Sequence, residues 1–266
     1  MDKSKKTIVI VLVAGMVLAM VGAGGVYYRA ATLSNWWQAK SVGDIPVLKG
    51  YTRVAVADSS YAAYLRSLPL KKRGSRLRLY SGVFAKHQIL SAAVVNQPLL
   101  NKYEQCADVA IRLRAEYLWQ NGRYDEIRFT DVHDSVMQYA VDSTRLDSLR
   151  HDFEEYLKEV FAWCNTMSME EETTPRDFME VEAGDILVHP PLEGENYGHA
   201  IVVVDVAKNA KGKVAIMCLE GNTPAREKHI VRNIRLWRNP WFVIDSNDRE
   251  IKFIKSRFHR GQLRHY

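Results

Sequence analysis

Residues of types that can together support covalent catalysis occur in order along the chain. Cys106 lies near the start of a helical pattern, His199 follows a glycine at the start of a strand pattern, and Glu220 and Asn222 end the next strand pattern. A cysteine hydrolase needs a thiolate, an imidazole within reach of it, and a third group that orients the imidazole. The order therefore predicts Cys106 as nucleophile, His199 as base, and Glu220 or Asn222 as the orienting group.

A packing role for the cysteine is the alternative. Cys106 falls on the apolar stripe of its helix, and free cysteine is among the most buried residue types. Cys164 and Cys218 fall on apolar faces of a helix and a strand, so we expect them in the core. With three cysteines, either one pair forms a disulfide or all three stay reduced. No cysteine or histidine spacing typical of a zinc site occurs, so we expect no metal and no cofactor.

The helix that carries Cys106 is the strongest helical pattern in the sequence. It is predicted over residues 102–121, because Asn101 and Glu104 form a capping-box pattern and Gly122 suits the position past the C-terminus. This start puts Cys106 in the second turn, where the helix dipole lowers a thiol pKa less than in the first. A second amphipathic helix is predicted over 146–166.

The last third of the chain is rich in strand patterns, which predicts an α+β fold with helices packed on an antiparallel sheet. If the strands that begin at His199 and end at Glu220 pair as a hairpin, these two residues lie at the same end of the sheet. Gly184 and Asp185 are expected to fix a turn. Residues 122–145 are polar and poorly periodic, and the acidic stretch 169–178 is expected to be a solvated loop. The remaining expected elements are strands over 51–57, 76–80, 92–96, 241–246 and 251–258, and a short helix over 59–70.

The N-terminus differs from the rest of the chain. Residues 7–28 carry no charged side chain and follow three lysines, which predicts a membrane-spanning helix with a cytoplasmic N-terminus, or else a cleaved signal peptide. The domain after it is then expected on the extracytoplasmic, periplasmic side. The net charge of +6 is too small and scattered to indicate nucleic-acid binding. The predicted organisation is an anchor or signal segment (1–29), a linker (30–50) and one α+β domain (51–266).

Four short motifs resemble those of the CHAP amidases and, more loosely, the NlpC-type peptidases, which share a papain-like fold. They are Gln105-Cys106, Gly184-Asp185, Gly198-His199-Ala200 and Glu220-Gly221-Asn222. The resemblance implies a papain-like core over 101–266, preceded by an elaboration over 51–100 and interrupted by an insertion over about 122–180. It also implies that Cys106 is the nucleophile, that His199 is the base and that Glu220 or Asn222 orients the imidazole. The implied substrate is an amide bond of peptidoglycan.

A longer resemblance covers nearly all of the chain from residue 50 onward. "YLRSLPLKKRGSRLRLYSG", "QCADVAIRLRAEYLWQNGRYDEI" and "GHAIVVVDVAKNAKGKVAIMCLEGNTPA" are similar to the domain-of-unknown-function family 4846 of bacterial envelope proteins. That family more often has Gln at the position of Glu220, and it carries no known activity. A non-catalytic envelope domain that binds glycan or a protein partner is therefore the second hypothesis.

Overall fold

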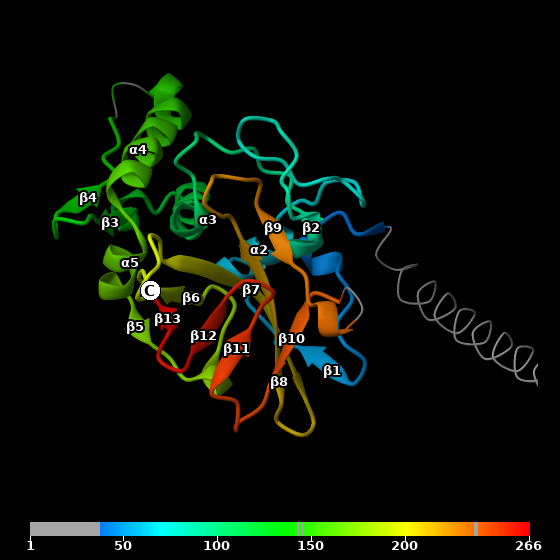
Figure 1. Ribbon diagram of the computed structural model, residues 1–266. Helices are drawn as coiled ribbons and strands as arrows, with labels where there is room; N and C mark the ends of the chain where they lie inside the picture. The colour runs from blue at the N-terminus through cyan, green and yellow to red at the C-terminus, as the bar shows by residue number, and fades with distance from the viewer. Residues whose placement is uncertain (1–37, 143, 145, 237–238) are drawn as a thin grey trace, which may run out of the picture.

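The computed structural model describes residues 38–142, 144, 146–236 and 239–266 (Figure 1). The fold is α+β, as predicted, with helices packed on a large antiparallel sheet. The predicted anchor, residues 1–29, lies outside the described residues. In the described part of the chain, no helix is both long and apolar enough to cross a membrane.

The sheet has nine strands, and β7 and β8 form its centre. Its main path runs β2-β9-β8-β7-β6-β13-β5, while β1 pairs with the far end of β7 and β10 pairs with β8. The strands are β1 (Tyr51–Arg53), β2 (Ser91–Val94), β5 (Thr174–Pro175), β6 (Ile186–His189), β7 (His199–Asn209), β8 (Val214–Glu220), β9 (His229–Val231), β10 (Trp241–Ile244) and β13 (Leu263–His265).

Two hairpins and four α-helices complete the described fold. The hairpins are β3 (Arg128–Thr130) with β4 (Val136–Gln138), and β11 (Glu250–Lys252) with β12 (Arg257–His259). The helices are α2 (Tyr61–Ser67), α3 (Cys106–Gln120), α4 (Leu149–Trp163) and α5 (Thr166–Glu172). In Figure 1, β3, β4 and α4 lie together on one side of the molecule, far from β1 and β10.

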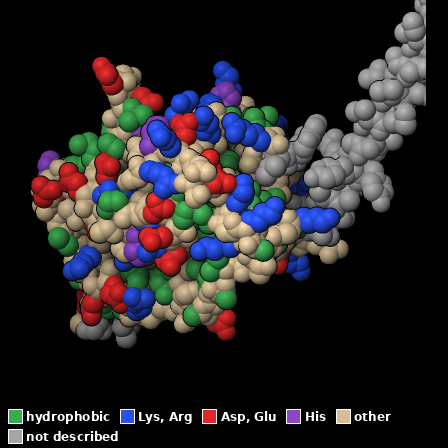
Figure 2. Space-filling view, turned by 90° about the horizontal axis from the view of Figure 1, so that it is seen from below, with side chains coloured by type: hydrophobic (Ala, Val, Ile, Leu, Met, Phe, Trp, Pro, Cys, Tyr) green, Lys and Arg blue, Asp and Glu red, His purple; other side chains and the backbone are tan. Residues whose placement is uncertain are grey.

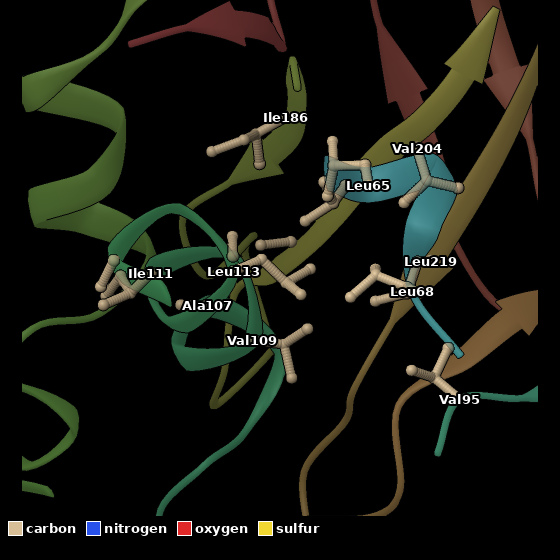
Figure 3. Close-up of a cluster of buried hydrophobic side chains, with 14 of the residues drawn as sticks. Leu65, Leu68, Val95, Ala107, Val109, Ile111, Leu113, Ile186, Val204 and Leu219 are labelled. Atoms are coloured by element: carbon tan, nitrogen blue, oxygen red, sulfur yellow. The ribbon is translucent and has the colours of Figure 1, made fainter. Parts of the chain in front are cut away.

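Side chains alternate along β7 and so divide the core into two clusters. Ala200, Val202 and Val204 belong to the larger cluster, with α3 and α2. Figure 3 shows side chains from α2, α3 and the strands converging there. Ile201 and Val203 point the other way, into a cluster that includes residues of β10, β11 and β12. The central strands are therefore buried on both faces, which explains their nearly continuous apolar runs.

Several predicted elements need correction. The acidic stretch 169–178 is not simply a solvated loop, because Thr166–Glu172 form helix α5, capped by the Asn165 side chain, which accepts from the Met167 amide at 2.8 Å. Residues 122–145 contain the β3–β4 hairpin. The strand expected at 251–258 is two short strands, β11 and β12, and 76–80 contributes only isolated bridges.

The surface carries charges of both signs. On the face in Figure 2, Lys and Arg side chains are interspersed with Asp and Glu. Such a distribution does not concentrate positive potential on that face as a nucleic-acid-binding surface does.

Candidate active site

Cys106 is the first residue of helix α3, not a second-turn residue as the sequence predicted. Gln105 is the N-cap, and its backbone N–H donates to Asp108 Oδ2 at 2.8 Å. The capping pattern at Asn101 is not used for a helix, since Asn101 Oδ1 accepts from the Tyr103 amide within a turn. A position in the first turn favours the thiolate form of Cys106 more than one in the second turn, because unpaired N–H groups and the positive end of the helix dipole lie there.

A buried ionic cluster holds the segment that leads into Cys106. Arg112 of α3 donates to Glu104 Oε2 at 2.7 Å and to the Pro98 carbonyl at 2.7 Å. The ammonium of Lys228, which is fully buried, also pairs with Glu104. Burial lowers the pKa of Lys228 to about 8, partly offset by the Glu104 charge. Because Glu104 is used here, it does not cap a longer helix, and α3 starts at Cys106.

The predicted hairpin of β7 and β8 is confirmed and brings a histidine to an acid. Val202 pairs with Leu219, so the start of β7 lies beside the end of β8. His199 Nε2 lies 3.0 Å from Glu220 Oε2. Asn222 is half-buried and lies two residues past the end of β8, while the Nε2 contact of the imidazole goes to Glu220.

Glu220 is a buried carboxylate with three basic neighbours. Its Oε1 lies 3.3 Å from Arg226 Nη2 and 3.2 Å from His229 Nε2, and its Oε2 faces His199. Burial favours the neutral acid, but the contacts with His199 and His229 outweigh it and hold the Glu220 pKa well below its usual range. Sequence reasoning missed Arg226 and His229, although both follow closely on the Glu-x-Asn motif.

Cys106 lies beside the start of β7 at the N-terminus of α3, where its Sγ donates to the carbonyl of Gly198 at 3.9 Å and His199 influences its ionisation. Burial opposes ionisation of the thiol, but the hydrogen bond and charge of His199, with the amides of Ala200 and Ala107, lower the Cys106 pKa. Burial likewise opposes the charge on His199, but Cys106 and Glu220 raise its pKa to about 10. Both shifts favour a thiolate–imidazolium pair at neutral pH. Because Nε2 faces Glu220, Nδ1 is the ring nitrogen that can exchange a proton with the sulfur.

Two glycines permit this close packing. A Cβ at Gly221 would lie 2.7 Å from Val109 Cγ2 and 2.9 Å from the Gln105 carbonyl, so a larger residue would push β8 away from the start of α3. A Cβ at Gly198 would overlap the Thr166 hydroxyl and lie 2.9 Å from the Pro190 carbonyl carbon. The predicted motifs around His199 and Glu220 thus contain glycine because backbones approach each other there.

A cleft of about 370 Å³ opens beside the thiol. Its walls come from the start of α3, from the α4–α5 junction and from the loop that precedes β7. Tyr103, Met167 and Tyr197 at its edge are about half-exposed or more. The lining residues are Tyr103, Gln105, Cys106, Ala107, Asp108, Phe161, Cys164, Asn165, Thr166, Met167, Pro191, Asn196, Tyr197, Gly198 and Thr223. Part of the predicted insertion, residues 161–167, therefore forms one wall.

The other residues singled out from the sequence lie elsewhere or serve packing. Asp185 is buried and fixes a turn, as predicted: its Oδ2 accepts from the Glu182 amide at 2.8 Å, and its Oδ1 lies 2.7 Å from His265 Nδ1. Cys218 is fully buried in β8, as predicted. Cys164 packs in the larger core cluster and also lines the cleft. All three cysteines are free thiols.

Comparison with family models gives one match, to domain of unknown function 4846, over residues 43–141 and 130–265. The chain belongs to this family. The two matched segments together cover almost the entire described fold, including every residue of the thiol–imidazole–carboxylate arrangement. Searches of curated proteins and of solved structures found no match. The family carries no assigned activity, so a function has to be argued from the site.

Proposed function

We propose that this protein is a cysteine hydrolase with a papain-like active site, acting on peptide or amide bonds of the cell wall. The observation that carries the proposal is the set of Cys106, which begins a helix and lines a cleft, His199, which lowers the thiol pKa, and Glu220, which contacts the imidazole. A cysteine that served packing alone would need no cationic partner. Cys218 of β8 is such a residue: burial and the charge of Glu220 both raise its thiol pKa.

The chemistry follows from the geometry. The Cys106 thiolate attacks the carbonyl carbon of the substrate, and the oxyanion that forms lies near the N–H groups at the start of α3. As the C–N bond breaks, the His199 imidazolium gives its proton to the leaving amine, and a thioester remains on Cys106. His199 then takes a proton from water, the hydroxide attacks the thioester, and the carboxylic acid leaves as the thiolate re-forms. Glu220 keeps its charge throughout and holds the ring.

The substrate class rests on the resemblance to cell-wall amidases and on the location expected from residues 7–28. An anchor there would hold the domain at the outer side of the cytoplasmic membrane, within reach of peptidoglycan. The volume of the cleft, about 370 Å³, suits a short peptide segment rather than a folded protein. Its edge of half-exposed Tyr103 and Tyr197 suits contact with either a peptide or a sugar ring.

The test is digestion of purified peptidoglycan, with released fragments and new amino termini measured by mass spectrometry. Wild-type protein is expected to release fragments, and Cys106→Ala and His199→Ala are expected to release none. Cys218→Ala removes a buried thiol elsewhere in the sheet and serves as the matched control, which should retain activity. A catalytically active Cys106→Ala variant would refute the proposal.

The second candidate is a non-catalytic envelope domain that uses the same cleft to bind glycan or a protein partner. The half-exposed aromatic and methionine side chains at the edge of the cleft favour it. This function predicts sedimentation of the protein with peptidoglycan without release of fragments, and the same binding by wild type and Cys106→Ala.

A further inference from the structure

Asp108 is an acid in the cleft that the proposed catalytic set does not use. It lies two residues after Cys106 in the first turn of α3, lines the cleft, and is 5% exposed. Its Oδ2 accepts from the Gln105 amide at 2.8 Å. Its Oδ1 is buried and has no hydrogen-bond partner among the described residues.

Among the described residues that line the cleft, no cationic side chain accompanies Asp108. Burial raises the pKa of Asp108 well above its usual range, and the negative charges of Cys106 and Glu104 raise it further. The charge of Asp108 also raises the pKa of Cys164, which lines the same cleft, although burial and Glu172 raise it more. Of the described residues that line the cleft, Asp108 is the one with a charged side-chain type, and no Lys or Arg faces it there.

Glu104 is a buried acid that, unlike Asp108, has cationic partners within the chain. Glu104 is completely buried, and Arg112 and Lys228 both pair with its carboxylate. Glu220 likewise has Arg226 beside it. A buried carboxylate is tolerated when it is paired, and an unsatisfied oxygen is destabilising. Asp108 lies close to the proposed nucleophile, and none of the described residues that line the cleft provides a cation to pair with its carboxylate.

We infer that Asp108 is a specificity residue that binds a positively charged amino group of the substrate, close to the bond that Cys106 attacks. The inference rests on the proposed function and narrows its substrate to peptides with a free amino group near the scissile bond. The ammonium group would pair with the Asp108 carboxylate and supply the missing charge, and a substrate with an acylated amine would leave that carboxylate unpaired. Discrimination between the two substrates would arise from this one contact.

The test measures how reagent charge affects the modification of Cys106 in the purified full-length protein. Three methanethiosulfonates of similar size are compared: aminoethyl, which is cationic, ethyl, which is neutral, and sulfonatoethyl, which is anionic. Modification of Cys106 is followed by peptide mass spectrometry. The wild-type protein is expected to react at least tenfold faster with the cationic than with the neutral reagent. In Asp108→Asn, which keeps the shape and a hydrogen-bond acceptor, that ratio is expected to fall at least threefold.

Glu195→Gln is the matched control. Glu195 is exposed on the loop before β7 and is not a lining residue, so its loss removes the same charge from the neighbourhood without touching the contact. The cationic-to-neutral ratio is expected to stay within twofold of wild type. An equal fall in Glu195→Gln and Asp108→Asn would overturn the inference, because it would show a general field rather than a site.

A second measurement uses only the wild-type protein and so does not depend on the folding of a variant. Alaninamide, which has a free amino group, is expected to slow iodoacetamide labelling of Cys106 at least fivefold more than N-acetylalaninamide at the same concentration. Equal effects would overturn the inference. If Cys106 reacts rapidly with the neutral reagent but shows no preference for charge, the Asp108 inference fails and the hydrolase proposal stands. If Cys106 is inert to all three reagents, both fail.

Discussion

The ionisation of Cys106 gives the most direct prediction, because it needs no substrate. His199 is the group whose hydrogen bond and charge lower the thiol pKa against the effect of burial. In His199→Ala these contributions are lost and burial remains, so the thiol pKa should exceed the ordinary value of about 8.5. At pH 7 the ionised fraction of the thiol would then fall below that of the wild type, to a few per cent or less.

The rate of alkylation changes less than the ionised fraction. A thiolate of higher pKa is a stronger nucleophile, and with a Brønsted slope of about 0.4–0.5 each unit by which the thiol pKa rises makes the thiolate about threefold more reactive. Once the thiol pKa exceeds about 7, each further unit therefore lowers the iodoacetamide rate at pH 7 by about threefold, because the ionised fraction falls about tenfold. The pH profile discriminates better: the wild-type rate should have its inflection below the ordinary thiol pKa of about 8.5, whereas the inflection of the variant should lie above that value.

The assay is iodoacetamide labelling of the folded protein, read at each cysteine by peptide mass spectrometry. Cys164 provides a comparison within the molecule, since burial raises its pKa to about 12 and it should label far more slowly than Cys106. His189→Ala is the matched control, because His189 pairs with His199 across β6 and β7 but its Nδ1 lies 2.8 Å from the Pro190 carbonyl oxygen. A wild-type profile with an inflection near 8.5 that is unchanged in His199→Ala would refute the assignment of an ion pair.

Three further predictions use the neighbours of the site. Glu220→Gln should raise the inflection pH of thiol labelling and lower the free energy of unfolding, measured in urea, by roughly 3 kcal/mol. Both effects are expected because the buried basic side chains around Glu220 lose their anionic partner. The control variant Asn222→Ala should leave the inflection pH unchanged. Gly198→Ala should slow thiol labelling and cost about 1–3 kcal/mol, because the added methyl overlaps its neighbours at the start of β7; normal labelling would contradict this. Glu104→Gln should destabilise by about 3–5 kcal/mol, and Lys228→Met by clearly less, since Glu104 keeps its guanidinium partner in the second variant; equal losses would argue against the cluster.

The part of the site that follows from the pairing of two consecutive strands could be predicted from the sequence. The apolar runs that begin at His199 and end at Glu220 are bounded by turn residues, and antiparallel pairing of consecutive strands is the simplest arrangement. The hairpin, and with it the proximity of these two side chains, follows from the positions of the strand ends alone. The choice between Glu220 and Asn222 as imidazole partner required coordinates, because both lie at the same end of the strand.

The start of α3 could not be predicted, because tertiary contacts override the local pattern. Asn101 and Glu104 form a good capping box in isolation, which is worth about 1 kcal/mol. In the folded chain Glu104 instead pairs with Arg112 and with Lys228, which lies far away in sequence. Helix α5 was missed for a related reason: it is one short polar segment, and contacts with β3 and β6, rather than its own periodicity, hold it.

If Cys106 and His199 form the proposed ion pair, charges of alternating sign follow one another at the site: the Cys106 thiolate, the His199 imidazolium, the Glu220 carboxylate and the Arg226 guanidinium. His199 and Glu220 would each lie between two groups whose charge is opposite to their own. Removal of any one charged side chain would therefore leave a buried neighbour without its counter-charge. Loss of stability in a Cys106 or His199 variant is therefore expected whether the cysteine is a nucleophile or a packing residue. A double-mutant cycle does not separate the two roles either, because neighbouring residues are coupled in stability whether they form an ion pair or pack together. Stability measured one residue at a time does not separate these roles, whereas the pH dependence of thiol reactivity does.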